Sequence, residues 1–346
     1  MNPMQSPLML SICIATFRRA DYIAQTLDSI IPQLTDQVEL IVVDGASPDH
    51  TPEVLAGYVA RCPRLRYVRE PVNSGIDPDY DRAVSYARAE YCWLMTDDDL
   101  LVEGAIAEVL AKLGTNDLIV VNAEVCDKDL GRPLRSSMLA HKQDMTFDDA
   151  ERLFVEMTAY LSFIGGVIVR RAWWLQRQRE PYYGTLFVHV GALFQSPPIA
   201  RAAVIGRPLI VIRFGNAMWS ARSFEIWMFK WPELIWSFEH FSREARAAVT
   251  AQLPFRSFKR LIWFRAIGGY SIDEYRHFLM TRGNAQYRLA ASAIARLPGR
   301  VANFCCAVYY FLRADKSHSG MELYDLARST HSTWFARRVD AMRRSL

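Results

Sequence analysis

The chain has 346 residues, of which 51% are hydrophobic and 23% are charged, and its formal net charge is +4. This length and composition exclude a disordered polypeptide and suffice for one large domain or two smaller ones with a buried core. No apolar run reaches the roughly 20 residues of a membrane-spanning helix, and the amino terminus lacks the basic and apolar segments of a secretory signal.

The first 125 residues alternate strand-like and helix-like patterns. Apolar runs typical of strands buried on both faces lie at residues 10–15, 38–43, 65–68, 91–95 and 118–122. Amphipathic or capped helical patterns separate them, at residues 23–34, from Thr51, at 79–89 and at 103–113. This order predicts an α/β fold with an open, mostly parallel sheet and helices on both faces.

The rest of the chain differs in character. Strand-like runs at 167–170 and 209–214 are followed, beyond about residue 220, by helical, aromatic and basic sequence. Eight of the nine tryptophans lie after residue 170. We therefore predict two closely packed regions, residues 1–215 and a helical region at 216–346, the first consisting of halves 8–125 and 126–215.

The six cysteines form no Cys-x-x-Cys pair, and Cys13 and Cys92 lie within apolar strand-like runs. Such cysteines are typical of reduced core residues, so we expect a cytoplasmic protein.

Acidic residues follow two of the predicted strands. Thr96-Asp97-Asp98-Asp99 comes directly after the run at 91–95, and Asp44 follows the run at 38–43. Adjacent carboxylates repel each other unless a cation or hydrogen-bond donors neutralise them, and carboxylate oxygens suit Mg²⁺ or Mn²⁺ holding a diphosphate. The alternatives are a helix N-terminus for the acidic run and a turn cap for Asp44.

Four segments in the same order resemble the family 2 glycosyltransferases of the GT-A fold. They are Ser11-Ile12-Cys13-Ile14-Ala15-Thr16-Phe17-Arg18-Arg19, then Glu39-Leu40-Ile41-Val42-Val43-Asp44-Gly45-Ala46-Ser47, then Asn73-Ser74-Gly75 with Ala87, Glu90 and Tyr91, and finally Trp93-Leu94-Met95-Thr96-Asp97-Asp98-Asp99. The acidic run and the stretch Tyr183-Gly184-Thr185 with His189 further resemble abequosyltransferase-type enzymes of O-antigen assembly.

The resemblance implies a nucleotide-diphospho-sugar transferase fold, with the donor-binding half at 8–125 and the acceptor half at 126–215. It implies an inverting transfer from a CDP-, UDP-, GDP- or dTDP-sugar, with Mg²⁺ or Mn²⁺ as cofactor and a lipid-linked saccharide as acceptor in cell-surface polysaccharide assembly. It assigns the metal to the Asp97–Asp99 run, without deciding which carboxylates coordinate it. The donor-binding residues that it implies are Thr16, Phe17, Arg18, Asp44, Asn73, Gly75, Asp81, Asp97 and Asp98.

The chain departs from the family pattern at three places. Arg18 stands where the family usually has Asn, Gly45 replaces the second Asp of the turn after the second strand, and Tyr80-Asp81 stands where Arg-Asn is common. The matching stretch for the base that deprotonates the acceptor has no acid. His189 is our first candidate for that base because its ordinary pKa leaves it largely neutral near pH 7, and Glu180 and Asp81 are the alternatives.

Residues 256–346 hold 16 basic and 6 acidic residues, a net charge of +10, while the preceding part has a net charge of −6. No nucleic-acid motif accompanies this excess, and Trp227, Trp231, Trp236 and Trp263 lie in or near it. This combination predicts peripheral attachment to an anionic membrane surface on the cytoplasmic side, where an acceptor of this kind is found. The alternative is an ordinary helical region with a solvated basic face, and self-association is compatible with either.

Two further functions compete with the transferase. A nucleotidyltransferase would need a glycine-rich loop after the first strand, where this chain has Thr16-Phe17-Arg18-Arg19. A non-catalytic scaffold of a polysaccharide assembly complex would keep the fold without the chemistry.

Overall fold

The computed structural model describes residues 7–199, 201–218, 220–312 and 320–342. Its strands are β1 (Leu10–Thr16), β2 (Val38–Asp44), β3 (Leu65–Arg69), β4 (Tyr91–Met95), β5 (Leu100–Leu101), β6 (Leu118–Cys126), β7 (Pro133–Arg135), β8 (Met145–Phe147), β9 (Val167–Arg170) and β10 (Ala202–Arg213). Its α-helices are α1 (Ile23–Ile30), α2 (Thr51–Val59), α3 (Ile76–Tyr86), α4 (Ala105–Leu110), α5 (Ala150–Met157), α6 (Arg171–Leu175), α7 (Val188–Phe194), α8 (Ser223–Glu225), α9 (Trp231–Ser237), α10 (Arg243–Val249), α11 (Phe258–Ile267), α12 (Ile272–Glu274), α13 (Ala285–Arg296), α14 (Gly299–Leu312), α15 (Gly320–Arg328) and α16 (Trp334–Met342).

The main path of the sheet runs β3-β2-β1-β4-β9-β6-β10-β5. β1 is parallel to β2 and β4, and β2 is parallel to β3. β9 pairs antiparallel with both β4 and β6, so a strand from later in the chain separates the fourth and fifth strands that the sequence predicts. The predicted α/β fold is confirmed, and the structure adds the antiparallel pairings beyond β4.

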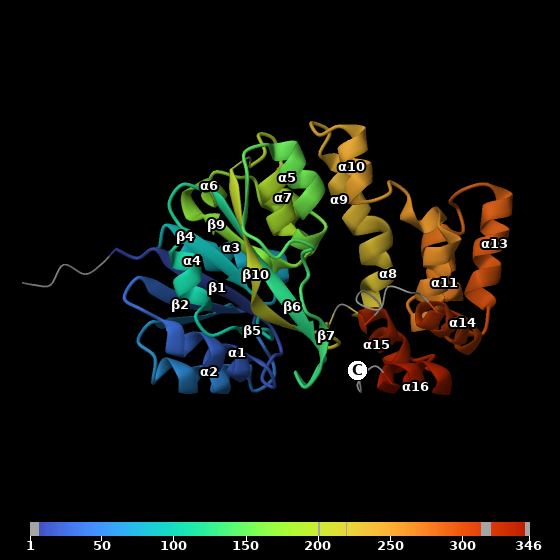
Figure 1. Cartoon of the computed structure of the whole chain (residues 1–346), viewed down its shortest axis with the longest axis horizontal. Coiled ribbons are helices and arrows are strands. Elements are labelled where there is room, and N and C mark those ends of the chain that lie inside the picture. Colours follow the sequence, from blue (N-terminus) through green and yellow to red (C-terminus); the bar gives the residue numbers. More distant parts are fainter. Residues whose placement is uncertain (1–6, 200, 219, 313–319, 343–346) are drawn as a thin grey trace, which may run out of the picture. The chain divides into compact units, whose positions relative to one another are not determined.

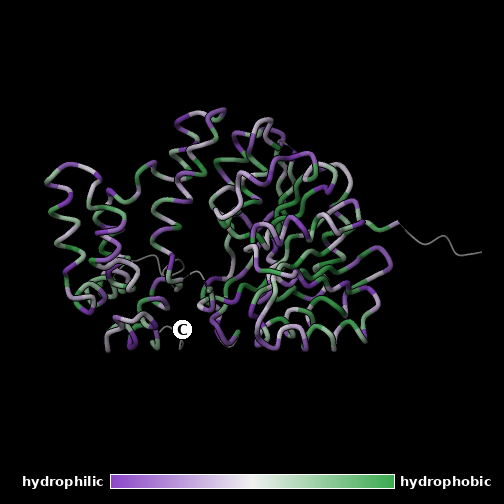
Figure 2. The backbone as a smooth tube through the Cα atoms, turned by 180° about the vertical axis from the view of Figure 1, so that it is seen from behind, coloured by the Kyte–Doolittle hydropathy of each residue, from purple (hydrophilic) through white to green (hydrophobic). Residues whose placement is uncertain are grey.

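Helices cover the sheet on both faces, so β1 and β2 are buried along their whole length. Leu10, Ile12 and Ile14 alternate along β1 and share one hydrophobic cluster with Ile23 and Leu27 of α1. Helix α3 packs against β1 and β2. Figure 1 shows α1 and α2 on the opposite side of the sheet from α5 and α7, and Figure 2 shows the hydrophobic colour of the strands between them.

The chain forms two compact units. Unit 1 contains the described residues up to Val125 together with Ser136–Arg213 and Phe238–Val249. Unit 2 contains Cys126–Arg135, Phe214–Ser237 and the described residues from Thr250 onward. Each unit takes in a segment that a single boundary at residue 215 would give to the other. The domain division at residue 215 remains a prediction.

Aromatic packing explains why Phe238–Val249 belongs to unit 1. The ring of Phe241 stacks on Phe154 of α5 at 4.1 Å between centroids, and Phe238 meets Phe154 edge to face at 6.1 Å. Aromatic pairs of this kind contribute beyond their buried area, which ties the segment to α5.

Unit 2 has its own aromatic core. Phe224 stacks on Tyr270 at 4.9 Å, and Phe229 stacks on Phe255 at 5.3 Å. The tryptophans that the sequence places at a membrane surface take part in internal packing instead. Trp231 is only 4% exposed, and Trp236 Nε1 donates a hydrogen bond to the carbonyl of Thr250 at 3.0 Å.

Candidate functional site

The carboxyl ends of three neighbouring parallel strands meet at one edge of the sheet. Thr16 at the end of β1 lies opposite Asp44 at the end of β2, and Ile14 lies opposite Met95, the last residue of β4. The acidic run Asp97–Asp99 follows Met95 directly. This is the edge at which open α/β sheets bind their ligands, and the fold therefore brings together the acidic residues that the sequence singles out.

An arginine joins two carboxylates of the acidic run. Arg19 Nε lies 3.2 Å from Asp97 Oδ1, and its terminal nitrogen lies 3.2 Å from Asp98 Oδ2. Burial, and after it the charge of Asp98, raises the pKa of Asp97 to about 7, although Arg19 opposes the shift. Arg19 is not among the predicted site residues, although it ends the first segment that resembles the family, three residues after Thr16.

Asp99 is held by the protein itself. Its Oδ1 accepts a hydrogen bond from the backbone N–H of Arg213 at 2.7 Å, and its Oδ2 accepts one from Thr96 Oγ1 at 2.5 Å. Arg213 Nε also donates to the carbonyl of Asp98 at 2.9 Å. Asp99 thereby links the acidic run to the end of β10, while the carboxylates of Asp97 and Asp98 face Arg19.

The carboxylates of the acidic run are suitable ligands for the divalent metal that the fold family implies. The side chains of Asp97 and Asp98 are each 12% exposed, and both carboxylates pair with the guanidinium of Arg19. Within the described residues, no group of three or more His, Cys, Asp or Glu side chains is placed to hold a metal ion. Mg²⁺ usually binds one or two protein carboxylates together with water and phosphate oxygens, so two carboxylates are sufficient.

Asp44 locks the turn after β2. It is fully buried, and it accepts hydrogen bonds from the backbone N–H of Ser47 at 2.8 Å and from the hydroxyl of Tyr67 at 2.9 Å. Arg18 has a φ of 56°, and its N–H donates to Ser47 Oγ at 2.9 Å, which ties the turns after β1 and β2 together. A non-glycine residue at positive φ is strained, and such strain is typical of binding sites.

The loop before α3 carries the predicted residues Asn73 and Gly75. Asn73 Oδ1 accepts a hydrogen bond from the N–H of Gly75 at 2.9 Å, and Gly75 has a φ of 97°, a conformation that favours glycine. Helix α3 begins at Ile76, three residues before the start that the sequence predicts, because the turn at Gly75 ends the preceding loop.

Two further acids of α3 position a distant segment. Asp77 accepts hydrogen bonds from the backbone N–H groups of Gly184, Leu186 and Val188, at 2.8, 2.9 and 3.1 Å. Asp81 accepts from Trp174 Nε1 at 2.8 Å, from Arg179 Nε at 3.0 Å and from the hydroxyl of Tyr183 at 2.6 Å. The carboxylate of Asp81 is thus fully engaged, and Asp77 is an anchor that sequence analysis did not identify.

His189 lies at the start of α7 and is 1% exposed. Its Nε2 lies 2.7 Å from the carbonyl of Leu161, which can only accept, so Nε2 carries the proton. Nδ1 is buried and has no hydrogen-bond partner within the described part of the chain. Burial lowers the pKa of His189 to about 4, so the ring is neutral at physiological pH. Glu180, the first alternative base, is exposed.

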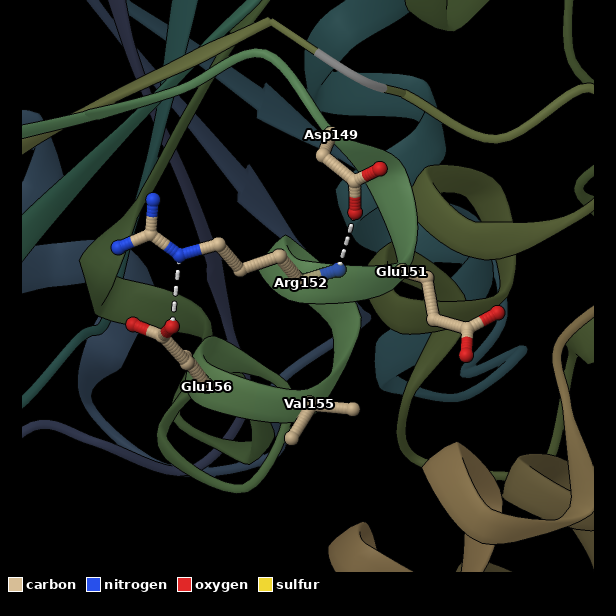
Figure 3. Close-up of a pocket in the computed structure, with 5 residues that line it drawn as sticks. All are labelled: Asp149, Glu151, Arg152, Val155 and Glu156. Carbon is tan, nitrogen blue, oxygen red and sulfur yellow. Dashed lines mark hydrogen bonds and ion pairs between the residues drawn. The ribbon is translucent and has the colours of Figure 1, made fainter.

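An open pocket of about 460 Å³ lies elsewhere in unit 1, on the surface of α5 (Figure 3). Asp149 accepts a hydrogen bond from the N–H of Arg152 at 2.6 Å, and Arg152 Nε pairs with Glu156 at 2.8 Å. These are a helix cap and a surface ion pair, and none of the predicted site residues lines this pocket.

Comparison with known proteins agrees with this geometry. Residues 11–173 match the model of the family "Glycosyl transferase family 2". The abequosyltransferase RfbV of Salmonella typhimurium is 28% identical over 229 residues, which cover 60% of this chain and 68% of that protein. The putative glycosyltransferase EpsH of Bacillus subtilis is 25% identical over 142 residues, 41% of each chain. A third match, to an uncharacterised protein of Mycobacterium tuberculosis, spans 26% of this chain and 27% of that one.

Solved structures support the fold. The Staphylococcus aureus TarS fragment 1–349, solved in complex with UDP, has a TM-score of 0.56 at 16% identity and covers 92% of this chain and 91% of that one. The Pyrobaculum calidifontis mannosyltransferase PcManGT, solved with GDP-Man and Mn²⁺, has a TM-score of 0.50 at 15% identity and covers 98% and 88%. Residues 11–173 therefore match the family 2 glycosyltransferases, and the chain is a transferase enzyme with a GT-A-like fold.

Proposed function

We propose that this glycosyltransferase moves a sugar from a nucleotide-sugar donor to a saccharide acceptor in cell-surface polysaccharide assembly, with inversion at the anomeric carbon. The observation that carries the proposal is the meeting of Asp44 and the acidic run Asp97–Asp99 at the carboxyl ends of β1, β2 and β4. The likeness to an abequosyltransferase and to a structure solved with UDP supports it.

The donor is held by the loops at this edge. The turns after β1 and β2, fixed to each other through Ser47, present Thr16, Phe17, Arg18 and Asp44 to the nucleoside. Asn73 and Gly75 lie in the loop before α3, whose first turn faces the same turn after β2. The ion pair and hydrogen bonds of Asp81 make it a positioning residue, which holds Arg179 and Tyr183 in place.

Asp97 and Asp98 would hold the Mg²⁺ or Mn²⁺, and Asp99 fixes their backbone to β10. When bound, such a metal neutralises the charge of the departing nucleoside diphosphate. Arg19 already bridges both carboxylates and can turn to the diphosphate as a second cation, because a guanidinium pairs readily with phosphate oxygens.

His189 is our proposed base for the acceptor hydroxyl. Its Nδ1 has a free lone pair, and the hydrogen bond from Nε2 to Leu161 fixes the tautomer that leaves this lone pair available. Because the residue is 1% exposed, the acceptor must displace part of the surrounding chain to reach it. Glu180, exposed on the segment that Asp77 and Asp81 anchor, is the competing base.

The acceptor that we propose is lipid-linked, and the enzyme works at the cytoplasmic face of an anionic membrane. Among the described residues, no helix is long and apolar enough to cross a bilayer. The net charge of +10 over residues 256–346 supports peripheral attachment.

Thermal unfolding against a panel of nucleoside diphosphates and nucleotide sugars, each with and without Mn²⁺, tests the proposal. A ligand that binds only the folded state raises the melting temperature in proportion to its occupancy. We expect one base to give a metal-dependent shift, followed by slow donor hydrolysis without acceptor. A triphosphate-specific shift would favour a nucleotidyltransferase, and no shift at all would favour the scaffold.

A further inference from the structure

Helix α14 turns a continuous apolar face to the solvent. Val301, Phe304 and Phe311 are 49%, 48% and 50% exposed, and Leu312 at the end of the helix is 73% exposed. Their spacing is that of one face of a helix, whereas Ala302, Asn303 and Ala307 on the other side are buried. Helix α14 therefore has two apolar faces, one toward the core of unit 2 and one toward water.

The face continues onto α16. The ring of Phe335 contacts those of Phe304 at 5.3 Å and Phe311 at 6.0 Å, which places the start of α16 beside the outer face of α14. The next residue toward the amino terminus, Trp334, is 71% exposed. We call the surface made by Val301, Phe304, Phe311, Leu312, Trp334 and Phe335 the α14 face.

Exposed cations lie on α14 and α16 near the residues of the α14 face, and another contacts α14 itself. Lys259 Nζ lies 3.2 Å from the hydroxyl of Tyr309 and 5.1 Å from the centre of its ring, and Tyr309 is itself 44% exposed on α14. Arg300 precedes Val301, and Arg337 and Arg338 follow on α16, all of them exposed. Exposed phenylalanine, leucine and tryptophan with a basic border are the composition of a helix that lies in a bilayer interface.

We propose that the α14 face is the surface by which this chain lies on an anionic lipid bilayer. This inference rests on the proposed function and names the part of the molecule that performs the attachment. Helix α14 has 14 residues and is about 21 Å long at 1.5 Å per residue, too short to cross the bilayer, so it lies in the plane of the interface. A second copy of the chain is a poorer occupant, because a symmetric contact would bring the cations of one copy, among them Lys259, Arg300 and Arg337, near the same set of cations on the other.

Vesicle sedimentation of the full chain tests the inference without any nucleotide. We expect binding to vesicles that contain phosphatidylglycerol, little binding to pure phosphatidylcholine, and weakening by salt. The double variant Phe304→Ser with Phe311→Ser should lower the partition coefficient roughly tenfold or more, since it removes two inserted rings. Lys259→Glu with Arg300→Glu should do the same and abolish the lipid selectivity.

Val59→Ser, at an apolar residue of α2 in unit 1 that is 40% exposed, is the matched control and should bind vesicles like the parent. Because all the substituted side chains are exposed, thermal unfolding should change little. Equal binding by the Phe304→Ser/Phe311→Ser variant and the parent would overturn the inference. So would a dimer that only this variant loses, which would assign the face to a second copy. Metal-dependent nucleotide binding is read separately, so its failure would count against the proposed function alone.

A second inference comes from Gly45, which stands where the family has another acid. A Cβ atom added at Gly45 would lie 2.5 Å from Asp79 Oδ2, so a side chain of α3 occupies the space that the missing one would need. Asp79 is 1% exposed, and its hydrogen bonds, from Ser74 at 3.4 Å and from Arg82 at 3.0 Å, both go to Oδ1. Within the described residues no donor reaches Oδ2.

We infer that Asp79 supplies from α3 the second carboxylate of the nucleoside site, and that its Oδ2 accepts a hydrogen bond from a ribose hydroxyl or a base N–H. This also rests on the proposed function. An acceptor oxygen that no protein donor occupies is available to a hydrogen-bond donor of a ligand. Asp79→Asn should therefore weaken the nucleoside diphosphate that the parent binds by roughly tenfold, measured by calorimetry.

A sharper test moves the carboxylate from position 79 to position 45. Gly45→Asp alone should destabilise the fold through its contact with Asp79, whereas Gly45→Asp with Asp79→Gly should fold and regain nucleotide affinity. Glu53→Gln, on the exposed side of α2, is the control and should bind as the parent does. Unchanged affinity in Asp79→Asn would overturn the inference, while absence of nucleotide binding in the parent would overturn the proposed function itself.

Discussion

The two units of the chain break the ordinary rule of burial in opposite ways. Unit 1 buries carboxylates that would be more stable in water, among them Asp44, Asp79 and the run Asp97–Asp99, at 0–9% exposure. Unit 2 exposes apolar side chains that would be more stable in its core, such as Phe311 and Trp334. Each exception costs stability, and the partners that we propose would offset the cost, a cation and nucleotide in unit 1 and an anionic bilayer in unit 2.

The largest effect should come from the buried carboxylates that face Arg19. Asp98→Ala is expected to lower kcat/KM by about a thousandfold and to abolish the metal-dependent thermal shift with nucleotide, because it removes half of the proposed ligand pair. The melting temperature without ligand should hold or rise, since charge repulsion with Asp97 is relieved. Asp99→Ala is the contrasting variant, and it should lower the melting temperature because Asp99 fastens Arg213. Loss of stability in Asp98→Ala instead would assign this carboxylate a structural role.

The second largest effect should come from substitution of the proposed base. His189→Gln is expected to reduce kcat about a hundredfold while donor binding stays intact, as removal of a general base does. The same assay on Glu180→Gln decides between the two candidates, because only the true base should give this separation of kcat from donor affinity. Because the pKa of His189 is about 4, the rate should stay level above about pH 5 if His189 is the base. Full turnover in His189→Gln together with a reduced rate in Glu180→Gln would assign the role of the base to Glu180.

A substitution in unit 2 should lower the stability of the protein without altering nucleotide binding. Asn303 is fully buried in α14, donating to the carbonyl of Leu326 at 2.9 Å and accepting from the N–H and hydroxyl of Thr333 at 3.0 and 2.9 Å. Asn303→Leu should cost about 3 kcal/mol of the free energy of unfolding, because several buried polar groups lose their partners. Nucleotide binding, which we assign to unit 1, should persist at temperatures below the transition. Loss of both together would mean that the two units do not act separately.

The smallest effect is a pH dependence of stability. Burial raises the pKa of Asp79 from 3.8 to about 6, against the opposing charge of Arg82. The native state therefore binds this proton more tightly than the unfolded state does, and the free energy of unfolding should decrease as the pH rises from about 4 to about 6. Asp79→Asn should remove this decrease and be more stable than the parent at pH 7, by about 1 to 3 kcal/mol. Urea unfolding across this range measures it. A stabilised variant that binds nucleotide poorly would separate a binding role of Asp79 from a structural one.

Sequence reasoning failed where packing overrides local pattern. The strand expected at 209–214 is the end of β10, which begins at Ala202, because Pro208 interrupts the pattern without ending the strand. The insertion of β9 beside β4 has no signal in the order of elements. Trp231 stands among basic residues in the sequence, yet its ring is buried in unit 2.

The sequence by itself determined the α/β fold, the resemblance to the family 2 glycosyltransferases and the edge of the sheet where the acidic residues meet. These properties follow from local periodicity and from short motifs, which depend on neighbouring residues. The tertiary structure alone decided that Arg19 bridges Asp97 and Asp98, that Asp79 fills the space beside Gly45, and that an apolar face of α14 is left outside. Contacts between residues far apart in the chain, and the choice of which helix face meets the core, are fixed only when all elements compete for burial together.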